Sequence, residues 1–518
     1  MAGRAQQVTL WAGGAVAALL GLLTLGTLAA VALRAGGSVL LSVADLSALR
    51  FTLEQAALSA ALSVSLAVPV ARALARRRFP GRRWLVALMG APFLLPVIVA
   101  VFGLLALFGR HGLLNAGLAL LGLPGVSIYG LHGVVLAHVF FNLPLAVRLL
   151  LQGWRAIPAE RFRLAAALGF SPADVARLIE RPMLRAVLPG ATLAIFLVCL
   201  TSFAVALTLG GGPAATTVEL AIYQAFRFDF DLGRAALLAG IQFVLCGGAT
   251  LIAFRVGLPA TEAPGLDRPV ERWDAGAPLL RLQDAVLITL AALFLMIPLG
   301  LVAVDGVPGL LALPAPVWLS ALRSLGVAVA SSALCGGMAL ALALARTASG
   351  RAAFDLAGML PLVASPLVLG TGLFLLVNPV ADPAFWALPV TALVNAAMAL
   401  PFALRALQPA LDRIEATHGR LADSLGLTGW ARLRLLILPR LRGPLGFALG
   451  LAAALSMGDL GVIAIFAGPG GATLPLQVYR LMGAYRMAQA SGAALLLLGL
   501  SLGLFWLFDR GGRGDADA

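Results

Sequence analysis

Apolar runs of about 20 residues recur along the whole chain and alternate with short segments that are rich in arginine. A helix of that length spans the roughly 30 Å hydrocarbon core of a bilayer, so each run predicts a transmembrane helix. A transmembrane β-barrel would instead show shorter segments in which apolar and polar residues alternate. The pattern therefore predicts an all-α integral membrane protein with about 12 transmembrane helices. The predicted spans are 10–33, 52–71, 85–108, 130–151, 189–210, 235–257, 283–303, 323–345, 353–377, 387–408, 443–467 and 489–508.

The composition agrees with a membrane protein. Of 518 residues, 61% are hydrophobic and 12% are charged, so the chain is too apolar to bury its surface in one soluble core. With the N-terminus inside, 29 of the 37 basic residues, all arginines, face the cytoplasm. The positive-inside rule therefore predicts cytoplasmic N- and C-termini. The net charge of +14 then reflects topology and does not predict nucleic-acid binding.

One polar pattern occurs twice, at an offset of 257 residues. We call the copies cassette 1 (163–185) and cassette 2 (420–442); 10 of their 23 positions are identical. Such a match exceeds what a composition rich in Leu, Ala and Arg produces. The shared residues that define the pattern are Arg163, Leu164, Ala165, Gly169 and Pro182 in cassette 1, and Arg420, Leu421, Ala422, Gly426 and Pro439 in cassette 2.

Each cassette predicts a helix, a sharp break and a second helix. Gly169 and Gly426 suit the break at a helix C-terminus, and Ser171 and Thr428 suit the N-cap of the helix that follows. Pro158 suits the first position of the helix that enters cassette 1. The proline near the end of each cassette predicts a bend or a stop. Such short helices can dock in a partner's groove through residues at helical spacing, which here are Leu164, Leu168, Leu421 and Leu425.

The duplication predicts two six-helix halves arranged as a parallel tandem repeat. The first half is residues 1–258, the polar, proline-containing segment 259–281 is a cytoplasmic linker, and the second half is residues 282–518. The repeated transmembrane cores are about 52–257 and 321–508. Six spans in each half place both cassettes on the same side, so a translocation path should run between the halves.

Several kinds of chemistry are excluded or unsupported. The chain has no lysine, and a Walker A loop needs the lysine of GxxxxGK[ST], so this ATP site cannot be present. The four histidines and three cysteines have no metal-ligand spacing. No paired carboxylates or nucleophile constellation support a polytopic membrane enzyme. The sequence predicts no enzyme, no cofactor and no metal, and any ATP that drives the protein is hydrolysed by another subunit.

The cassettes resemble the EAA loops of the type I permeases of binding-protein-dependent ABC importers. The resemblance rests on three residues of each cassette: the alanine, the glycine four residues after it, and the proline thirteen residues after that glycine. It implies the type I ABC importer permease fold in a bacterial inner membrane. It also implies a periplasmic binding protein and two copies of an ATP-binding subunit whose clefts hold the cassettes as coupling helices. The shared residues of both cassettes would form this coupling site. One departure is clear, because Arg163 and Arg420 stand where the family's motif is acidic.

Three segments resemble in particular the thiamine and thiamine pyrophosphate permeases, namely 137–148, 209–224 and 456–461. This resemblance implies import of thiamine, thiamine pyrophosphate or both. An iron(III)-type ABC permease stays open as an alternative, since spacing and composition do not separate these substrates. A gradient-driven secondary transporter is a further alternative, but such proteins use carboxylate relays within their spans and this chain has few acids there.

Three residues are candidates for contact with the substrate or its carrier. Asp459 lies in a glycine-rich stretch of a predicted span, where an ionisable residue predicts a place on the substrate path. Packing specificity is an equally good account of that carboxylate. Glu219 and Tyr223 lie just outside a span and share one helical face, so we expect them where a periplasmic binding protein docks.

Overall fold

The computed structural model describes residues 2–35, 41–90, 94–257, 273, 276–468 and 470–512. Within these residues the protein is helical and contains no strand. Most of the predicted linker, 259–281, lies outside the described residues, and the second half's first helix begins at Pro278.

The first half contains thirteen α-helices, several of them short. They are α1 (Ala2–Gly21), α2 (Thr27–Ala35), α3 (Val43–Arg76), α4 (Arg82–Leu88), α5 (Val97–Phe108), α6 (Leu113–Leu120), α7 (Leu131–Ala156), α8 (Ala159–Ala167), α9 (Pro172–Val175), α10 (Arg181–Leu200), α11 (Ala204–Leu209), α12 (Val218–Arg227) and α13 (Leu232–Val256). The second half contains α14 (Pro278–Leu310), α15 (Ala315–Ser349), α16 (Ala353–Met359), α17 (Pro366–Val377), α18 (Pro383–Ser424), α19 (Gly429–Arg432), α20 (Leu438–Met457), α21 (Gly461–Phe466), α22 (Leu474–Gly483) and α23 (Met487–Gly512).

Eleven helices of the described chain are long and apolar enough to cross a membrane. A bent pair, Ala353–Val363 and Pro366–Val377, meets at 87° and makes twelve if it counts as one span. The bend has a local cause: Pro366 keeps the preceding residue out of the helical region, and Ser365 instead caps α17 by accepting from the Val368 N–H at 3.1 Å. The prediction of an all-α membrane protein with about 12 spans is confirmed.

Three further predicted spans are broken. The span expected at 85–108 contains the end of α4 at Leu88 and the start of α5 at Val97. The span expected at 189–210 is interrupted between α10 and α11, and the one at 443–467 between α20 and α21. Pro96, the N-cap of α5, marks the first of these breaks, whereas the other two contain no proline.

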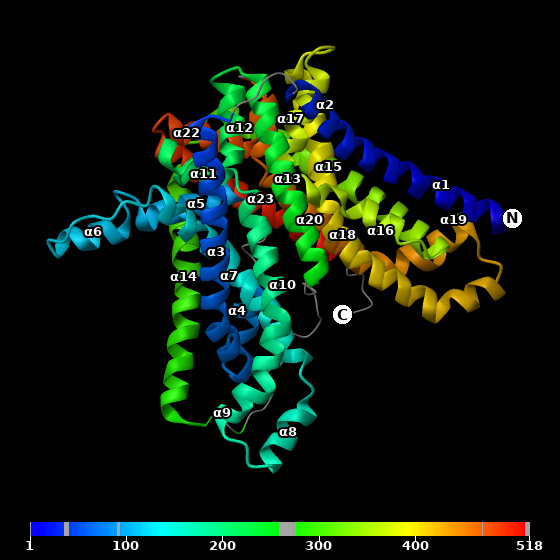
Figure 1. The fold of residues 1–518 in the computed structure, drawn as a ribbon, viewed down its shortest axis with the longest axis horizontal. Helices are drawn as coiled ribbons and strands as arrows, with labels where there is room; N and C mark the ends of the chain where they lie inside the picture. Colours follow the sequence, from blue (N-terminus) through cyan, green and yellow to red (C-terminus); the bar gives the residue numbers. More distant parts are fainter. Residues whose placement is uncertain are drawn as a thin grey trace.

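The first helix of each half packs against the other half (Figure 1). α1 lies along α15, and α2 packs against α13 and α17. α14 in turn packs against α3 and α5 as well as α23. Each half therefore covers part of its neighbour.

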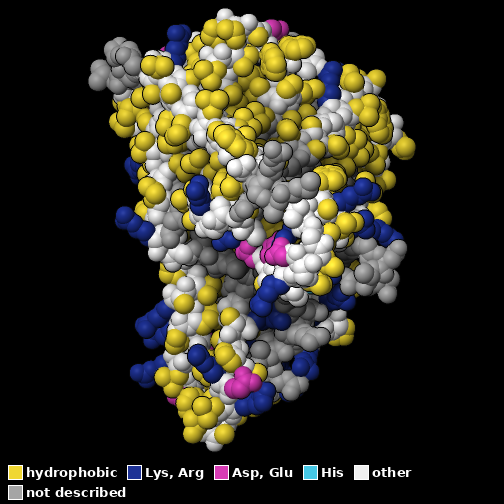
Figure 2. Space-filling model, turned by 90° about the vertical axis from the view of Figure 1, so that its right-hand side faces the viewer, with side chains coloured by type: hydrophobic (Ala, Val, Ile, Leu, Met, Phe, Trp, Pro, Cys, Tyr) yellow, Lys and Arg dark blue, Asp and Glu magenta, His cyan; other side chains and the backbone are white. Residues whose placement is uncertain are grey.

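Both cassettes lie away from α12 and α22, cassette 1 with α8 and α9 at the bottom of Figure 1 and cassette 2 with α19 at its right-hand side. Hydrophobic side chains cover the upper part of the face in Figure 2, whereas arginines are concentrated in its lower part. The arginine-rich part of this face is thus the part away from α12 and α22, as the cassettes are.

One buried contact occurs in both halves. The backbone N–H of Val218 donates to Thr52 Oγ1 at 2.9 Å, and the N–H of Leu474 donates to Ser324 Oγ at 2.8 Å. Each contact joins the start of a short helix, α12 or α22, to a long one, α3 or α15. This is the pairing that a duplicated chain is expected to repeat.

Candidate functional site

A cavity of about 360 Å³ lies between the two predicted halves. α7 and α18 line it, together with the breaks that follow α10 and α20. α12 and the first turns of α5 and α17 also contribute. The polar side chains on its wall are His138, Asn142, Thr201, Ser202, Glu219, Asn395 and Asp459.

The two helix breaks occupy corresponding places on the cavity. Residues 201–203 separate α10 from α11, and residues 458–460, 257 positions later, separate α20 from α21. Inside a membrane, backbone that leaves the helical form is tolerated where it is buried in protein or lines a cavity. Discontinuous helices of this kind build the substrate sites of many transporters.

Asp459 lies in the second break and lines the cavity, where the sequence predicted a place on the substrate path. Its Oδ1 accepts from the Gly461 N–H at 3.2 Å. Its Oδ2 is buried and has no hydrogen-bond partner among the described residues. One carboxylate oxygen is therefore available to a group inside the cavity.

Glu219 lines the same cavity from the first turn of α12. Its side chain is buried, and neither carboxylate oxygen has a hydrogen-bond partner in the described part of the chain. Tyr223, one turn further on, is also buried and packs edge-on against Phe203 and Phe228. Docking of a binding protein on Glu219 and Tyr223 stays a prediction, and this conformation does not expose either side chain. The four-residue spacing correctly placed them on one face but could not show that the bundle covers it.

His138 was given no role by its spacing, yet it lies at the centre of the polar wall. Its Nδ1 is 3.2 Å from Ser59 Oγ and its Nε2 is 2.7 Å from Ser202 Oγ, so the ring joins α7 to α3 and to the first break. The 257-residue offset pairs His138 with Asn395, which also lines the cavity. That offset is the signal that could have found it.

The second half has its own polar cluster at this level. Asn395 Nδ2 donates to Ser456 Oγ at 3.1 Å, and Ser456 Oγ lies 2.9 Å from Ser331 Oγ. These bonds join α18 to α20 and α15. Both halves therefore fix the cavity wall with polar contacts between three segments of the chain.

The cassettes share one backbone motif at their glycines. Gly169 has φ +67° and Gly426 has φ +65°, which is the left-handed region. The N–H after each glycine, of Phe170 and of Leu427, donates back to the carbonyl of Ala165 and Ala422 at 3.0 and 2.9 Å. This is a Schellman ending, and it was predicted from the glycines.

The tip of each cassette combines buried alanines with exposed leucines. Ala165 and Ala422 are each 2% exposed. The four leucines beside them present an apolar surface that nothing in the described chain covers. Their exposed fractions are 60% for Leu164, 63% for Leu168, 57% for Leu421 and 65% for Leu425. Arg163, with Glu160 at 3.5 Å, and Arg420 are exposed next to them.

Three local expectations differ from the structure. Of the bend or stop expected at Pro182 and Pro439, the stop is wrong. A π-helical turn, Ala176–Glu180 or Leu433–Ile437, precedes each proline, and the helix continues into α10 or α20. Thr428 makes no side-chain cap, whereas Ser171 forms a capping box with Asp174. Pro158 is the N-cap of α8 and not its first helical residue.

Known proteins resemble the chain over most of its length, although no family model matches it. The thiamine transport system permease protein ThiP of Brucella suis biovar 1 (strain 1330) is 41% identical, covering 98% of this chain and 96% of that protein. ThiP of Escherichia coli (strain K12) is 43% identical, covering 89% and 88%. A shorter relative, the molybdenum transport system permease protein ModB of Azotobacter vinelandii, is 32% identical over 42% of this chain and 92% of its own length. The chain belongs to the family of thiamine transport system permease proteins.

Proposed function

We propose that this chain is the membrane-spanning permease subunit of an ATP-driven ABC importer that moves thiamine from the periplasm to the cytoplasm. The family supports the transported solute, and the cavity between the halves supports a path for it. Glu219 and Asp459, which line one cavity from opposite halves with unpartnered oxygens, are the observation that carries the proposal.

The chemistry of the cavity suits thiamine better than its pyrophosphate. Thiamine carries a permanent positive charge on its thiazolium ring, and a buried carboxylate without a partner is stabilised by such a charge. Three aromatic rings on the same wall offer cation–π contacts, those of Phe141, Phe203 and Phe402. No arginine is among the described residues that line the cavity, so a pyrophosphate would meet two carboxylates without a counter-charge.

The iron(III) alternative receives less support. A hard trivalent cation needs a set of several oxygen or nitrogen ligands. The described residues contain no group of three or more His, Cys, Asp or Glu that could hold a metal ion. The relatives that cover most of the chain are thiamine permeases by name.

The cassettes would couple this cavity to ATP hydrolysis. We infer that two ATP-binding subunits bind the exposed leucines of the two tips from the cytoplasm, and that a periplasmic binding protein delivers the solute at the opposite end. The N- and C-termini are then cytoplasmic. A tandem repeat of two permease halves is supported by the duplicated cassettes and by the ModB relative, which matches less than half of the chain with nearly its whole length.

The experiment is thiamine-stimulated ATP hydrolysis by the purified complex in proteoliposomes. Glu219→Gln and Asp459→Asn should each raise the thiamine concentration for half-maximal stimulation at least tenfold and leave the basal rate unchanged. Because each substitution replaces a buried carboxyl group by an uncharged amide of the same shape, the variants should melt no earlier than the parent protein. Glu54→Gln is the matched control, since Glu54 is exposed and lies outside the cavity.

Other solutes and energy sources are tested in the same preparation. Stimulation by iron(III) in place of thiamine would favour the alternative importer. Uptake that persists without an ATPase subunit would favour a gradient-driven transporter. Normal thiamine stimulation in both cavity variants would show that the path lies elsewhere.

A further inference from the structure

A second, larger cavity opens at the arginine-rich end of the bundle, with a volume of about 1200 Å³. We call it the basic groove. Its walls are residues 76–79 at the end of α3, one face of α8, and α14 from Arg281 to Met296, with Trp273 beside them. It lies outside the cavity between the halves and shares no lining residue with it.

One end of the groove is strongly basic. Among the described residues that line it, five are arginines and none is acidic. Arg76 and Arg77 both bind the buried Asp284 from α14, Arg76 through its Nε at 2.7 Å and Arg77 at 2.6 Å. The exposed arginines of the groove are Arg78, Arg163 and Arg281. Glu160 offsets only part of this charge, since it lies 3.5 Å from Arg163.

The other end of the groove is an apolar strip on α14. Ile288, Ala292, Leu293 and Met296 recur at helical spacing and line it. From Arg281 to Met296 the helix rises roughly 22 Å, at about 1.5 Å per residue. A ligand that fills the groove therefore needs an anionic head and an apolar tail of about that reach.

The groove also has the position of a lipid site. The spans predicted from hydropathy, 52–71 and 283–303, place Arg76 and Arg281 just outside the hydrocarbon and the apolar strip within it. Basic pockets between transmembrane helices on the cytoplasmic side bind anionic lipid head groups. Trp273 beside the arginines is also typical of the interface.

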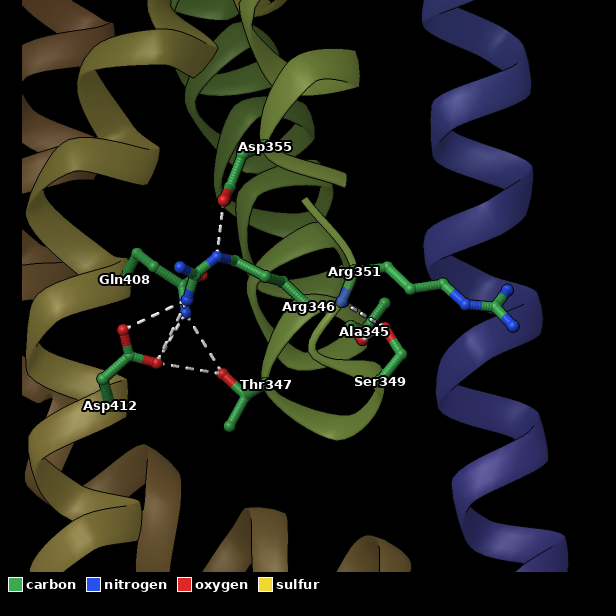
Figure 3. A network of polar contacts seen from close by, with 8 residues as sticks. All are labelled: Ala345, Arg346, Thr347, Ser349, Arg351, Asp355, Gln408 and Asp412. Atoms are coloured by element: carbon green, nitrogen blue, oxygen red, sulfur yellow. Dashed lines mark hydrogen bonds and ion pairs between the residues drawn. The ribbon is translucent and has the colours of Figure 1, made fainter. Parts of the chain in front are cut away.

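The arginine that corresponds to Arg76 in the second half is paired with carboxylates as well. The sequence Ala-Leu-Ala-Arg that ends α3 at Arg76 recurs in α15 up to Arg346. Figure 3 shows Arg346 directed at Asp355 of α16 and Asp412 of α18, with Nε and Nη1 distances of 2.5 and 3.2 Å. Gln408 and Thr347 bind the same Asp412. Two carboxylates thus balance the arginine there.

We propose that the basic groove binds one anionic phospholipid, with its phosphate between Arg78, Arg163 and Arg281 and an acyl chain along α14. The lipid would contact cassette 1 through α8 and would not contact cassette 2. This gives Arg163, which replaces the acidic residue of the family motif, a ligand of its own.

The test is lipid retention and stabilisation of the full-length chain in detergent. Native mass spectrometry should show one bound phosphatidylglycerol, and this lipid should raise the melting temperature where phosphatidylcholine does not. Arg78→Gln with Arg281→Gln should weaken phosphatidylglycerol binding at least tenfold. Ala292→Phe, which fills the apolar strip and leaves every charge in place, should weaken it as well.

The matched control is Arg255→Gln with Arg351→Gln, which removes two exposed arginines outside the groove. Equal loss of binding in the control, or full binding in both groove variants, would overturn the proposal. Stabilisation by inorganic phosphate or thiamine pyrophosphate as strong as that by phosphatidylglycerol would show a site for soluble anions instead. Tight binding in Ala292→Phe would exclude the acyl chain from the strip.

Discussion

Cassette 1 follows a break in the chain, whereas cassette 2 continues a transmembrane helix without interruption. α7 ends at Ala156 and α8 begins at Ala159, but α18 runs through the corresponding residues to Ser424. The difference has one local source. Pro158 holds Ile157 in an extended conformation with ψ 118°, and the residue 257 positions after Pro158 is Glu415, which fits a helix.

The two cassettes are also fastened by different charges. In cassette 1 the buried Glu180 accepts from Trp154 Nε1 at 3.1 Å and pairs with Arg72 at 2.8 Å, which joins the π-helical turn to α7 and α3. In cassette 2 the corresponding residue is the buried Ile437. There Arg432 binds Glu415 and Asp423 instead, across the break at Gly426.

The comparison separates the shape of a tip from its connection to the membrane. Two residues that are identical in the cassettes give both tips one shape. They are the glycine in the left-handed conformation and the alanine whose carbonyl accepts the Schellman hydrogen bond. Residues that differ decide the connection. In cassette 2 the tip and Asn395 of the cavity wall belong to one helix of 42 residues, so a displacement of the tip reaches the cavity directly. In cassette 1 it must pass through a loop or through Glu180.

Glu415→Pro tests this difference most severely. A proline at 415 removes an N–H from the middle of α18 and should lower the free energy of unfolding by about 3 kcal/mol. It should also give cassette 2 the hinged connection of cassette 1. Unfolding of the purified chain in mixed micelles measures the first effect, and thiamine-stimulated ATP hydrolysis of the complex measures the second. Glu415→Ala is the control. A proline variant as stable as this control would contradict the view that cassette 2 depends on an unbroken α18.

Glu180→Ala should have the next largest effect. Arg72 and the buried indole N–H of Trp154 then lose this acceptor, which should lower the free energy of unfolding by about 2 kcal/mol. Glu180→Gln keeps the volume and an acceptor for Trp154 and loses only the charge, so its unfolding free energy should fall between those of the parent and the alanine variant. Equal stability of all three proteins would mean that cassette 1 does not depend on this contact.

Gly169→Ala and Gly426→Ala should affect both cassettes alike. A Cβ at either glycine meets no atom within 4 Å, so the cost is conformational, about 1 kcal/mol for an L-residue in the left-handed region. Asn, which tolerates this region, should cost less. A bulky residue such as valine at 169 should leave expression intact and abolish thiamine stimulation of ATP hydrolysis. Unequal costs at the two glycines would show that the tips differ after all.

The tips and the number of spans were predictable because both depend on local chemistry. Long apolar runs define the spans, and Gly169, Gly426 and Ser171 act on their immediate neighbours. The packing of α1 and α14 against the opposite half was not predictable, since hydropathy does not tell which apolar faces pack together. The π-helical turns before Pro182 and Pro439 were not predicted, since a proline indicates a bend or a stop and not the kind of turn that precedes it.

The cavity was predictable only in part. Asp459 was found because a carboxylate in an apolar span is rare and costly. Glu219 was assigned to the surface, since the face of a short helix does not reveal what covers it. The breaks at 201–203 and 458–460 contain no proline, and they exist because both segments line the cavity. Residues of this kind are fixed by tertiary structure and cannot be read from a window of sequence.

The smallest expected effect belongs to Arg432→Gln. This side chain is 22% exposed and bridges Glu415 and Asp423, so its loss should cost at most about 1 kcal/mol, and less at high salt because ions screen partly exposed pairs. Cassette 1 has Val175 at the corresponding position and offers no such bridge. Unfolding of the parent and variant at low and high salt measures the difference. If the cost does not shrink with salt, Arg432 stabilises cassette 2 by packing, and the two cassettes then differ in their contacts and not in their charges.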